Sequence, residues 1–302
     1  MTKTRTRAYL ILLAVSAIWG FAGPVIRFTV GFIPPFLFLL YRFFLSAIAG
    51  IFLLSFTKTQ WPKKISDIIW ITIYCFLTST VSLGLLFLGY EKTTALDGSI
   101  INALYPIMVS ATGAAFLHER VTRREKTGMA IATLGTMAIV FEPGSSLSGN
   151  LYIIASLLVG IVLAIMAKLL LRHLVNFDFA LTQLSFIVGF VTVIPIVLFL
   201  YSPSSIYHLV TSIPASAHAS IFYMALISGT LAYSLWHRAQ KTIETGETAV
   251  FSYLYPIFTI PLSILWLHEQ VTPIFIFGAF ITAIGVIIAE TKKQPHPPNP
   301  HQ

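Results

Sequence analysis

Apolar residues in this chain come in long continuous runs rather than in alternation with polar ones. A helix needs about 20 apolar residues to cross a bilayer, and backbone polar groups in lipid must be paired within the chain, which leaves helices or closed barrels. Continuous runs favour helices over alternating barrel strands. We therefore predict an all-α integral membrane protein with ten transmembrane helices, near residues 8–27, 35–56, 67–90, 94–117, 124–141, 149–171, 179–201, 216–237, 244–267 and 273–290.

One stretch of sequence occurs twice, 150 residues apart. Residues 104–122 read LYPIMVSATGAAFLHERVT, and residues 254–272 read LYPIFTIPLSILWLHEQVT. Both open with Leu-Tyr-Pro-Ile, and both close with Leu-His-Glu, one variable residue and Val-Thr. This spacing predicts two repeats of five helices each, over 1–141 and 149–290. The proline-rich remainder, 291–302, is predicted to be a disordered cytoplasmic tail.

The charged residues orient the predicted helices. Only 10% of the chain is charged, against about a quarter in a typical soluble domain. Sixteen of the 19 Lys and Arg residues fall on the side of the membrane that holds the N-terminus. Because cytoplasmic loops are enriched in Lys and Arg, we predict a multi-pass protein of the cell (inner or plasma) membrane with both termini in the cytoplasm. The net charge of +8 is then a membrane-surface feature rather than a sign of nucleic-acid binding.

The two copies of the repeat differ in charge, as their orientation requires. Five helices is an odd number, so the second repeat must enter the membrane inverted. The loop after the first copy, HERVTRREK, is basic, and the loop after the second, HEQVTPIF, has no Lys or Arg. Inverted repeats are typical of secondary transporters, whose binding sites lie near the midplane between the halves.

Both copies also end in helix-start signals. Thr122 and Glu125 have the spacing of a capping box. Thr272 precedes Pro273, which places a capping hydroxyl before a proline at the first helical position. We predict that a helix begins directly after each threonine.

The sequence also resembles a known family. The stretches GYEKTTALDGSIINALYPIMVSATGAAFLHERVT (89–122) and ETGETAVFSYLYPIFTIPLSILWLHEQVT (244–272), together with Trp19-Gly20 and Tyr41-Arg42-Phe43, resemble EamA-type members of the drug/metabolite transporter superfamily. The resemblance implies an exporter of small metabolites, such as amino acids or related polar or amphipathic compounds, that works by alternating access. A membrane-embedded enzyme and a non-transporting scaffold or receptor are the alternatives.

Candidate pathway residues lie at matching depths in the two repeats. A proline inside a helix has no N–H and frees the carbonyl four residues back. Pro106 therefore frees the carbonyl of Asn102, and Pro256 frees the carbonyl of Ser252. Both of these residues also have polar side chains. Polar groups at this depth are costly and usually functional, although a packing kink would also explain the prolines. The matched sets are Asn102, Tyr105 and Pro106 in the first repeat, and Ser252, Tyr255 and Pro256 in the second.

Charged and aromatic residues add further candidates. Asp97 and Glu247 are repeat-related; they are either acids favoured by the helix dipole or gate acids that bind an amine or relay protons. Arg42 lies within the second span, where a cation needs a partner; it either pairs with Asp97 or binds a substrate carboxylate. The early helices align at an offset of 141, which matches Arg42 with Gln183. Trp19 and Trp236 are pathway aromatics or ordinary core residues.

The sequence contains no motif that indicates chemistry. Its single cysteine, Cys75, excludes a disulfide framework, the histidines do not cluster, and no Gly-rich phosphate loop or nucleophile elbow occurs in a usable context. We predict no catalytic residue, metal or cofactor. The predicted partners are a small-molecule substrate and the lipid bilayer, with no nucleic acid, and the protein is expected to be a monomer or a homodimer.

Overall fold

The computed structural model describes residues 3–57, 59–116, 122–174, 177–240, 242, 248 and 250–290. No strand occurs among these residues. The first half contains α1 (Lys3–Val30), α2 (Pro35–Leu54), α3 (Ile65–Phe76), the π-helical η1 (Leu77–Ser82), α4 (Leu83–Lys92), α5 (Ala95–Asn102), α6 (Tyr105–Phe116) and α7 (Arg123–Val140). The second half contains α8 (Leu147–His173), α9 (Asp178–Leu200), α10 (Pro203–Ser212), α11 (Ala215–Phe222), the π-helical η2 (Tyr223–Leu231), α12 (Ala232–Gln240), the 3₁₀-helical η3 (Val250–Leu254), α14 (Tyr255–Leu267) and α15 (Pro273–Glu290).

Seven helices in this part of the chain are long and apolar enough to cross a membrane. Each coincides with a predicted span: Arg5–Val30, Pro35–Leu54, Ile65–Lys92, Leu147–Leu171, Asp178–Leu200, Ala215–Gln240 and Val250–Leu267. Shorter apolar helices cover Ala95–Val109 and Pro273–Ala289, and α7 occupies the predicted span at 124–141. The all-helical membrane class is therefore confirmed, while the count of ten spans remains a prediction.

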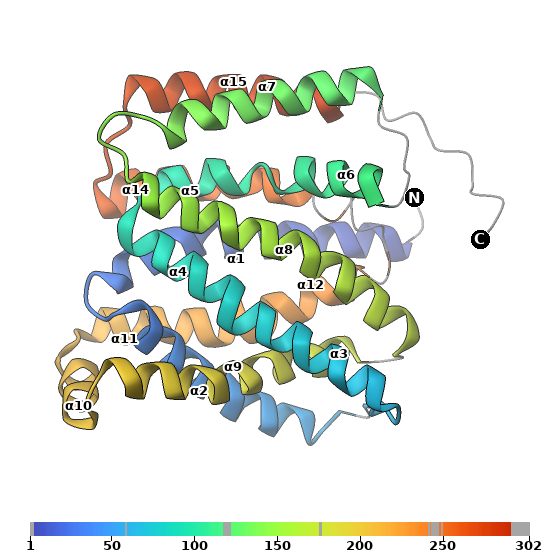
Figure 1. The fold of residues 1–302 in the computed structure, drawn as a ribbon, viewed down its shortest axis with the longest axis vertical. Helices are drawn as coiled ribbons and strands as arrows, with labels where there is room; N and C mark the ends of the chain where they lie inside the picture. Colours follow the sequence, from blue (N-terminus) through green and yellow to red (C-terminus); the bar gives the residue numbers. More distant parts are fainter. Residues whose placement is uncertain are drawn as a thin grey trace.

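One helix, α10, was not predicted from the sequence. It follows Ser202, whose hydroxyl accepts a hydrogen bond from the Ser205 N–H at 3.2 Å. A capping serine followed by Pro203 is a helix-start signal, so the local sequence accounts for it. None of its residues is buried, and Figure 1 shows it at one end of the bundle beside α9 and α11. Its ten residues are too few to span a bilayer.

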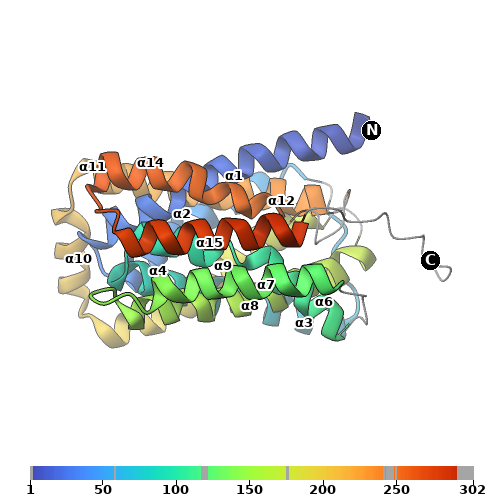
Figure 2. The ribbon, with the colours of Figure 1, turned by 90° about the horizontal axis from the view of Figure 1, so that it is seen from above.

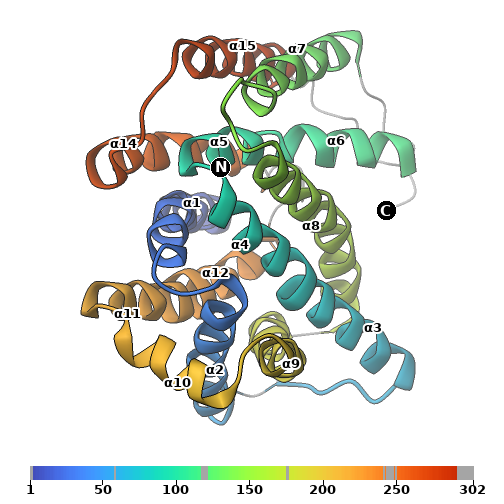
Figure 3. The ribbon, with the colours of Figure 1, turned by 60° about the vertical axis from the view of Figure 1, so that its left-hand side comes forward.

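The helices are stacked in layers. Figure 1 shows α7 and α15 paired at one edge, with α2, α9 and α10 at the opposite edge. In Figure 3 the layer next to the α7–α15 pair contains α5, α6 and α14, and α1, α4 and α12 follow. Figure 2 shows the start of α1 and the end of α15 at the same end of the bundle, as an even number of spans requires.

Reciprocal glycine contacts between α7 and α15 reveal the symmetry of the repeats. A Cβ atom on Gly128 would lie 2.6 Å from the Gly285 carbonyl oxygen, and one on Gly135 would lie 2.6 Å from the Gly278 carbonyl oxygen. A shift of 150 residues converts Gly128 into Gly278 and Gly135 into Gly285, so the contact is its own image. Such self-complementary contacts define a two-fold axis. The two helices are antiparallel, so the repeats have opposite orientations.

The helix-start signals in the two repeat copies act as predicted. The Thr122 hydroxyl accepts from the Glu125 N–H at 3.2 Å, and the Glu125 carboxylate accepts from the Thr122 N–H at 2.7 Å. This completes the capping box at the start of α7. The Thr272 hydroxyl accepts from the Phe275 N–H at 3.0 Å. Both predicted helix starts are confirmed.

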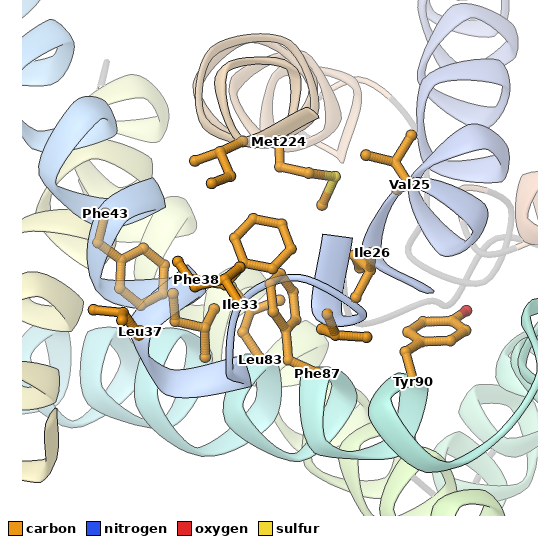
Figure 4. Packing of buried hydrophobic residues seen from close by; sticks show 14 of the residues in the cluster. Val25, Ile26, Ile33, Leu37, Phe38, Phe43, Leu83, Phe87, Tyr90 and Met224 are labelled. Carbon is orange, nitrogen blue, oxygen red and sulfur yellow. The ribbon is translucent and has the colours of Figure 1, made fainter. Parts of the chain in front are cut away.

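The largest apolar core joins the two halves. Figure 4 shows Phe38 and Phe87 facing each other, with Met224 approaching from η2 and Val25 from α1. The Phe38 and Phe87 ring centroids are 4.8 Å apart. In lipid, close packing rather than the exclusion of water holds such helices together. The core therefore fixes α2 and α4 of the first half against η2 of the second.

Candidate functional site

Helices break at equivalent points in the two repeats. In the first repeat α5 ends at Asn102, a two-residue turn follows, and α6 begins at Tyr105. In the second repeat the 3₁₀ helix η3 gives way to α14 at Tyr255. Pro106 and Pro256 each follow the new start, where the missing N–H and fixed φ of proline suit a first helical turn. The sequence predicted a continuous helix with one freed carbonyl at each proline. In the structure, one helix ends and another begins at this point in each repeat.

Asn102 and Ser252 lie directly before these breaks. The Asn102 amide Nδ2 donates to the Gly98 carbonyl at 2.8 Å, and Asn102 remains half-buried. Ser252 is buried. Beside Ser252, the Phe251 carbonyl accepts a hydrogen bond from the Ser16 hydroxyl at 2.9 Å. Helix α1 therefore binds the backbone of η3 just before α14 begins. Both breaks therefore present polar groups inside the bundle.

Aromatic side chains from three helices meet next to the breaks. The Trp19 ring centroid lies 4.9 Å from that of Tyr233, 5.1 Å from Trp236 and 6.3 Å from Tyr255. Trp19 Nε1 also donates to the Ser228 carbonyl at 3.0 Å. We call Trp19, Tyr233, Trp236 and Tyr255 the aromatic cluster. Sequence reasoning identified three of its members and missed Tyr233, which lies one helical turn before Trp236.

The repeat-related tyrosines begin the helices that follow the two breaks: Tyr105 is the first residue of α6, and Tyr255 is the first residue of α14. Tyr105 belongs to the first half, whereas Tyr233 and Tyr255 belong to the second. The structure thus brings three predicted pathway residues, Trp19, Trp236 and Tyr255, into ring contact, and places Tyr105 at the equivalent break of the first half.

Arg42 is fully enclosed but lacks the predicted acidic partner. The side chain is 1% exposed, and its guanidinium carbon lies 6.0, 5.6 and 5.7 Å from the ring centroids of Phe43, Phe87 and Phe186. Its Nε and Nη1 atoms have no hydrogen-bond partner among the described residues. The Phe186 ring in turn forms an edge contact with Tyr233, with 5.8 Å between the centroids. Arg42 therefore adjoins the aromatic cluster through Phe186.

The predicted alternative of an Arg42–Asp97 ion pair is wrong. Asp97 instead accepts a hydrogen bond from the Thr93 hydroxyl at 3.2 Å, and its own N–H donates to the Thr94 hydroxyl at 3.0 Å. Asp97 lies in the first turn of α5, where the helix dipole favours an acid. Its repeat counterpart, Glu247, lies outside the described residues, as does the predicted tail at 291–302.

A second acid at this helix start was missed by sequence reasoning. Glu269, between α14 and α15, accepts from the Ala95 N–H at 2.8 Å and the Leu96 N–H at 3.0 Å. Burial raises the pKa of this carboxyl above its ordinary value, despite the hydrogen bonds that act in the opposite direction. The Leu-His-Glu ending of the repeat was the available signal. Its first-repeat counterpart, Glu119, lies outside the described residues.

Two further features could not be read from periodicity. The π-helical turns η1 and η2 interrupt the third span of each half, and such turns often mark functional sites. His237 connects two other helices: its Nε2 lies 3.2 Å from the Tyr74 hydroxyl, and its Nδ1 lies 2.9 Å from the Thr182 hydroxyl. Within the described part of the chain, no three His, Cys, Asp or Glu residues are grouped to hold a metal.

Two inverted halves with broken helices at their junction are the architecture of secondary transporters. The sequence profile of the EamA-like transporter family matches residues 6–141 and 147–291. The chain therefore belongs to this family, and each half matches the same repeat.

Curated relatives align along nearly the whole chain. The chain is 25% identical over 302 residues to the uncharacterized transporter YetK of Bacillus subtilis, covering 97% of this chain and 90% of the relative. It is 23% identical over 300 residues to the probable amino-acid metabolite efflux pump of Salmonella typhimurium, covering 94% and 95%. It is 24% identical over 202 residues to the probable terminal-alkyne amino-acid exporter of Streptantibioticus cattleyicolor, covering 66% and 65%.

A solved crystal structure of a protein shares the fold. It superimposes with a TM-score of 0.61 at 16% sequence identity, over 94% of this chain and 96% of that one. At this identity the likeness supports the helical architecture alone.

Proposed function

We propose that this protein is a secondary transporter that moves a small polar or amphipathic metabolite across the cell membrane by alternating access. The carrying observation is that helices break at equivalent points of the two halves, with the aromatic cluster beside Tyr255 at one of the breaks. In inverted-repeat transporters, interrupted helices near the midplane form the substrate site. The same two-fold relationship lets one set of contacts open toward either side of the membrane.

The proposed pathway runs past the two breaks and the aromatic cluster. The carbonyl of Asn102 cannot form its helical bond because Pro106 has no N–H. The carbonyl of Ser252 is in the same position relative to Pro256. These carbonyls offer acceptors to a substrate that has lost water, and the tyrosines offer donors. Both termini are proposed to lie in the cytoplasm, following the distribution of Lys and Arg.

The proposed substrates are amino acids or related metabolites, and the proposed direction is export. Two relatives carry names that refer to amino-acid efflux or export. We propose transport in place of enzymatic or scaffold function because the family and the named relatives are transporters. The driving force is proposed to be an ion or substrate gradient.

Release from proteoliposomes tests the proposal. The purified protein would be reconstituted in vesicles loaded with a mixture of amino acids and other small metabolites, with and without an imposed pH gradient. Mass spectrometry would identify compounds that leave faster than from protein-free vesicles. We expect release of a subset of amino-acid-like compounds. Release no faster than from protein-free vesicles, for every compound and gradient, would contradict transport.

Two matched variants test the position of the pathway. Asn102→Leu and Ser252→Leu each remove a polar side chain at a break, and the lost contact is about 1–3 kcal/mol. That loss corresponds to roughly tenfold or more in affinity. Leu134→Ile is the control, since Leu134 is 68% exposed on the outside of α7. Normal release by both Leu variants would place the pathway elsewhere.

A further inference from the structure

We propose that Arg42 binds a carboxylate group of the transported substrate, which makes small carboxylates, including amino acids, the substrate class. The inference rests on the proposed transport function and adds the group that is recognised. It starts from the guanidinium, whose Nε and Nη1 atoms have no partner among the described residues although the side chain is 1% exposed.

An unpartnered cation at this depth needs an explanation. Buried polar groups are almost always hydrogen-bonded, and ionisable residues within membrane spans usually pair or mark a substrate path. Arg42 forms no ion pair with Asp97, the acid that sequence reasoning placed at a similar depth. A substrate anion would supply the missing acceptor.

The three rings around Arg42 attract its charge but offer no hydrogen-bond acceptor. Phe43, Phe87 and Phe186 lie within 6.0 Å of the guanidinium carbon, and cation–π attraction acts between the cation and the ring faces. The hydrogen-bond donors of the guanidinium are therefore not satisfied by these rings. The N–H bonds of the guanidinium lie in its plane, and Arg binds carboxylates through two parallel N–H bonds in that plane. The rings also exclude water, which strengthens an ionic hydrogen bond.

The repeat counterpart of Arg42 makes the proposed site asymmetric. Gln183 is 0% exposed, and both its Oε1 and Nε2 atoms lack partners in the described chain. A Cβ atom on Gly50 would lie 2.5 Å from Gln183 Oε1, so this amide packs against α2. Only Arg42 carries a charge at the two related positions. The carboxylate is therefore assigned to the half-site at Arg42.

The neighbouring aromatic cluster suits the rest of an amino acid. Phe186, whose ring centroid lies 5.7 Å from the Arg42 guanidinium carbon, forms an edge contact with Tyr233 at 5.8 Å. Tyr233 forms an edge contact with Trp19 at 4.9 Å. Ring faces attract an ammonium group and also contact an aliphatic or aromatic side chain. One end of the substrate would then bind Arg42, and the other would contact the cluster.

Matched pairs of compounds test the inference in the proteoliposome assay. Vesicles would contain leucine with leucinamide, phenylalanine with phenylalaninamide, and benzoate with benzamide. The proteins compared would be wild type, Arg42→Lys, Arg42→Gln and the control Lys63→Gln, which removes an exposed positive charge. We expect wild type and Lys63→Gln to release at least one carboxylate about tenfold faster than its amide partner. Arg42→Lys keeps the charge but lacks the bidentate fork, and both Arg42 variants should reduce that preference at least tenfold.

The possible outcomes separate failure of the carboxylate inference from failure of the transport function. Equal release of carboxylates and amides by wild type, or an unchanged preference in Arg42→Lys and Arg42→Gln, overturns the inference while transport itself stands. Release of no compound by wild type overturns the transport function and this inference together. If Arg42 is only a structural tie between helices, the folded Arg42→Lys protein should release both members of each pair more slowly by the same factor.

Discussion

The carboxylate of Glu269 accepts a hydrogen bond from the backbone N–H of Leu96 at 3.0 Å. Glu269 belongs to the second half and Leu96 to the first, so this bond joins the two halves. Its other oxygen binds the Ala95 N–H at 2.8 Å. A carboxylate at a helix start satisfies unpaired N–H groups and interacts favourably with the helix dipole. We call this pair of bonds the Glu269 latch.

Removal of the latch should destabilise the protein. Glu269→Ala leaves two N–H groups at the start of α5 without this acceptor, and loss of a helix cap costs about 0.5–2 kcal/mol. Thermal unfolding in detergent would measure the effect. Gln270→Ala is the control, because Gln270 is an exposed neighbour in the same loop. Equal unfolding temperatures for the two variants would mean that the latch has no role in stability.

The latch should also make stability depend on pH. Burial raises the pKa of the Glu269 carboxyl above its ordinary value of 4.5, so the folded chain retains this proton at a higher pH than the unfolded chain. The resulting stabilisation is fully present below 4.5 and is lost as pH rises through the raised pKa. Relative to Glu269→Gln, wild type should therefore lose unfolding temperature over this window. A difference that stays constant or grows with pH would contradict the prediction.

Close contact between α7 and α15 gives a third prediction. A Cβ atom on Gly285 would lie 2.2 Å from the Ala132 backbone nitrogen, so Gly285→Ala must push the helices apart. Overpacking of this kind costs about 1–3 kcal/mol. At Gly160 the nearest atom to a new Cβ is 3.8 Å away, and Gly160→Ala should be neutral or stabilising by up to about 1 kcal/mol. Thermal unfolding of both variants checks this, and a Gly285→Ala protein as stable as wild type would contradict the tight contact.

Inverted orientation of the halves predicts opposite labelling at two positions, one in the first turns of α7 and one in the loop before α15. Single cysteines at Thr127 and Gln270, both exposed, would be placed in a Cys75→Ala background. A membrane-impermeant maleimide added to intact cells should label the cysteine at 270 and leave the one at 127 unlabelled until the membrane is opened. Labelling of both from the same side would exclude inverted halves.

Short sequence motifs predicted much of the fold because each acts through contacts within one or two helical turns. The prolines at 106 and 256 act on their own helices, and the capping pair Thr122 and Glu125 forms within one turn. The π-helical turn η2 instead brings Gly229 close to Arg42 on α2, which is distant in sequence. No property of the chain around Gly229 reveals that contact.

The part of the candidate site that lies in the repeated stretches could be predicted from the sequence. Tyr105 and Tyr255 were identified because they are 150 residues apart, and each begins the helix that follows a break. The supposed partnership of Arg42 and Asp97 was inferred from depth alone, but depth does not fix which face of a helix a side chain occupies. Tyr233 was missed because it has no part in the repeated stretch, although it touches the same centre.

Reversible blocking of the central region tests the pathway most directly. Tyr255→Cys in a Cys75→Ala background would be reconstituted and treated with a membrane-permeant methanethiosulfonate reagent, with modification verified by protein mass. Leu134→Cys, on the lipid-facing side of α7, is the matched control. If the substrate passes between the halves, modification at 255 should reduce metabolite release at least tenfold and dithiothreitol should restore it, whereas modification at 134 should change little. Undiminished release from fully modified Tyr255→Cys protein would contradict a pathway between the two helix breaks.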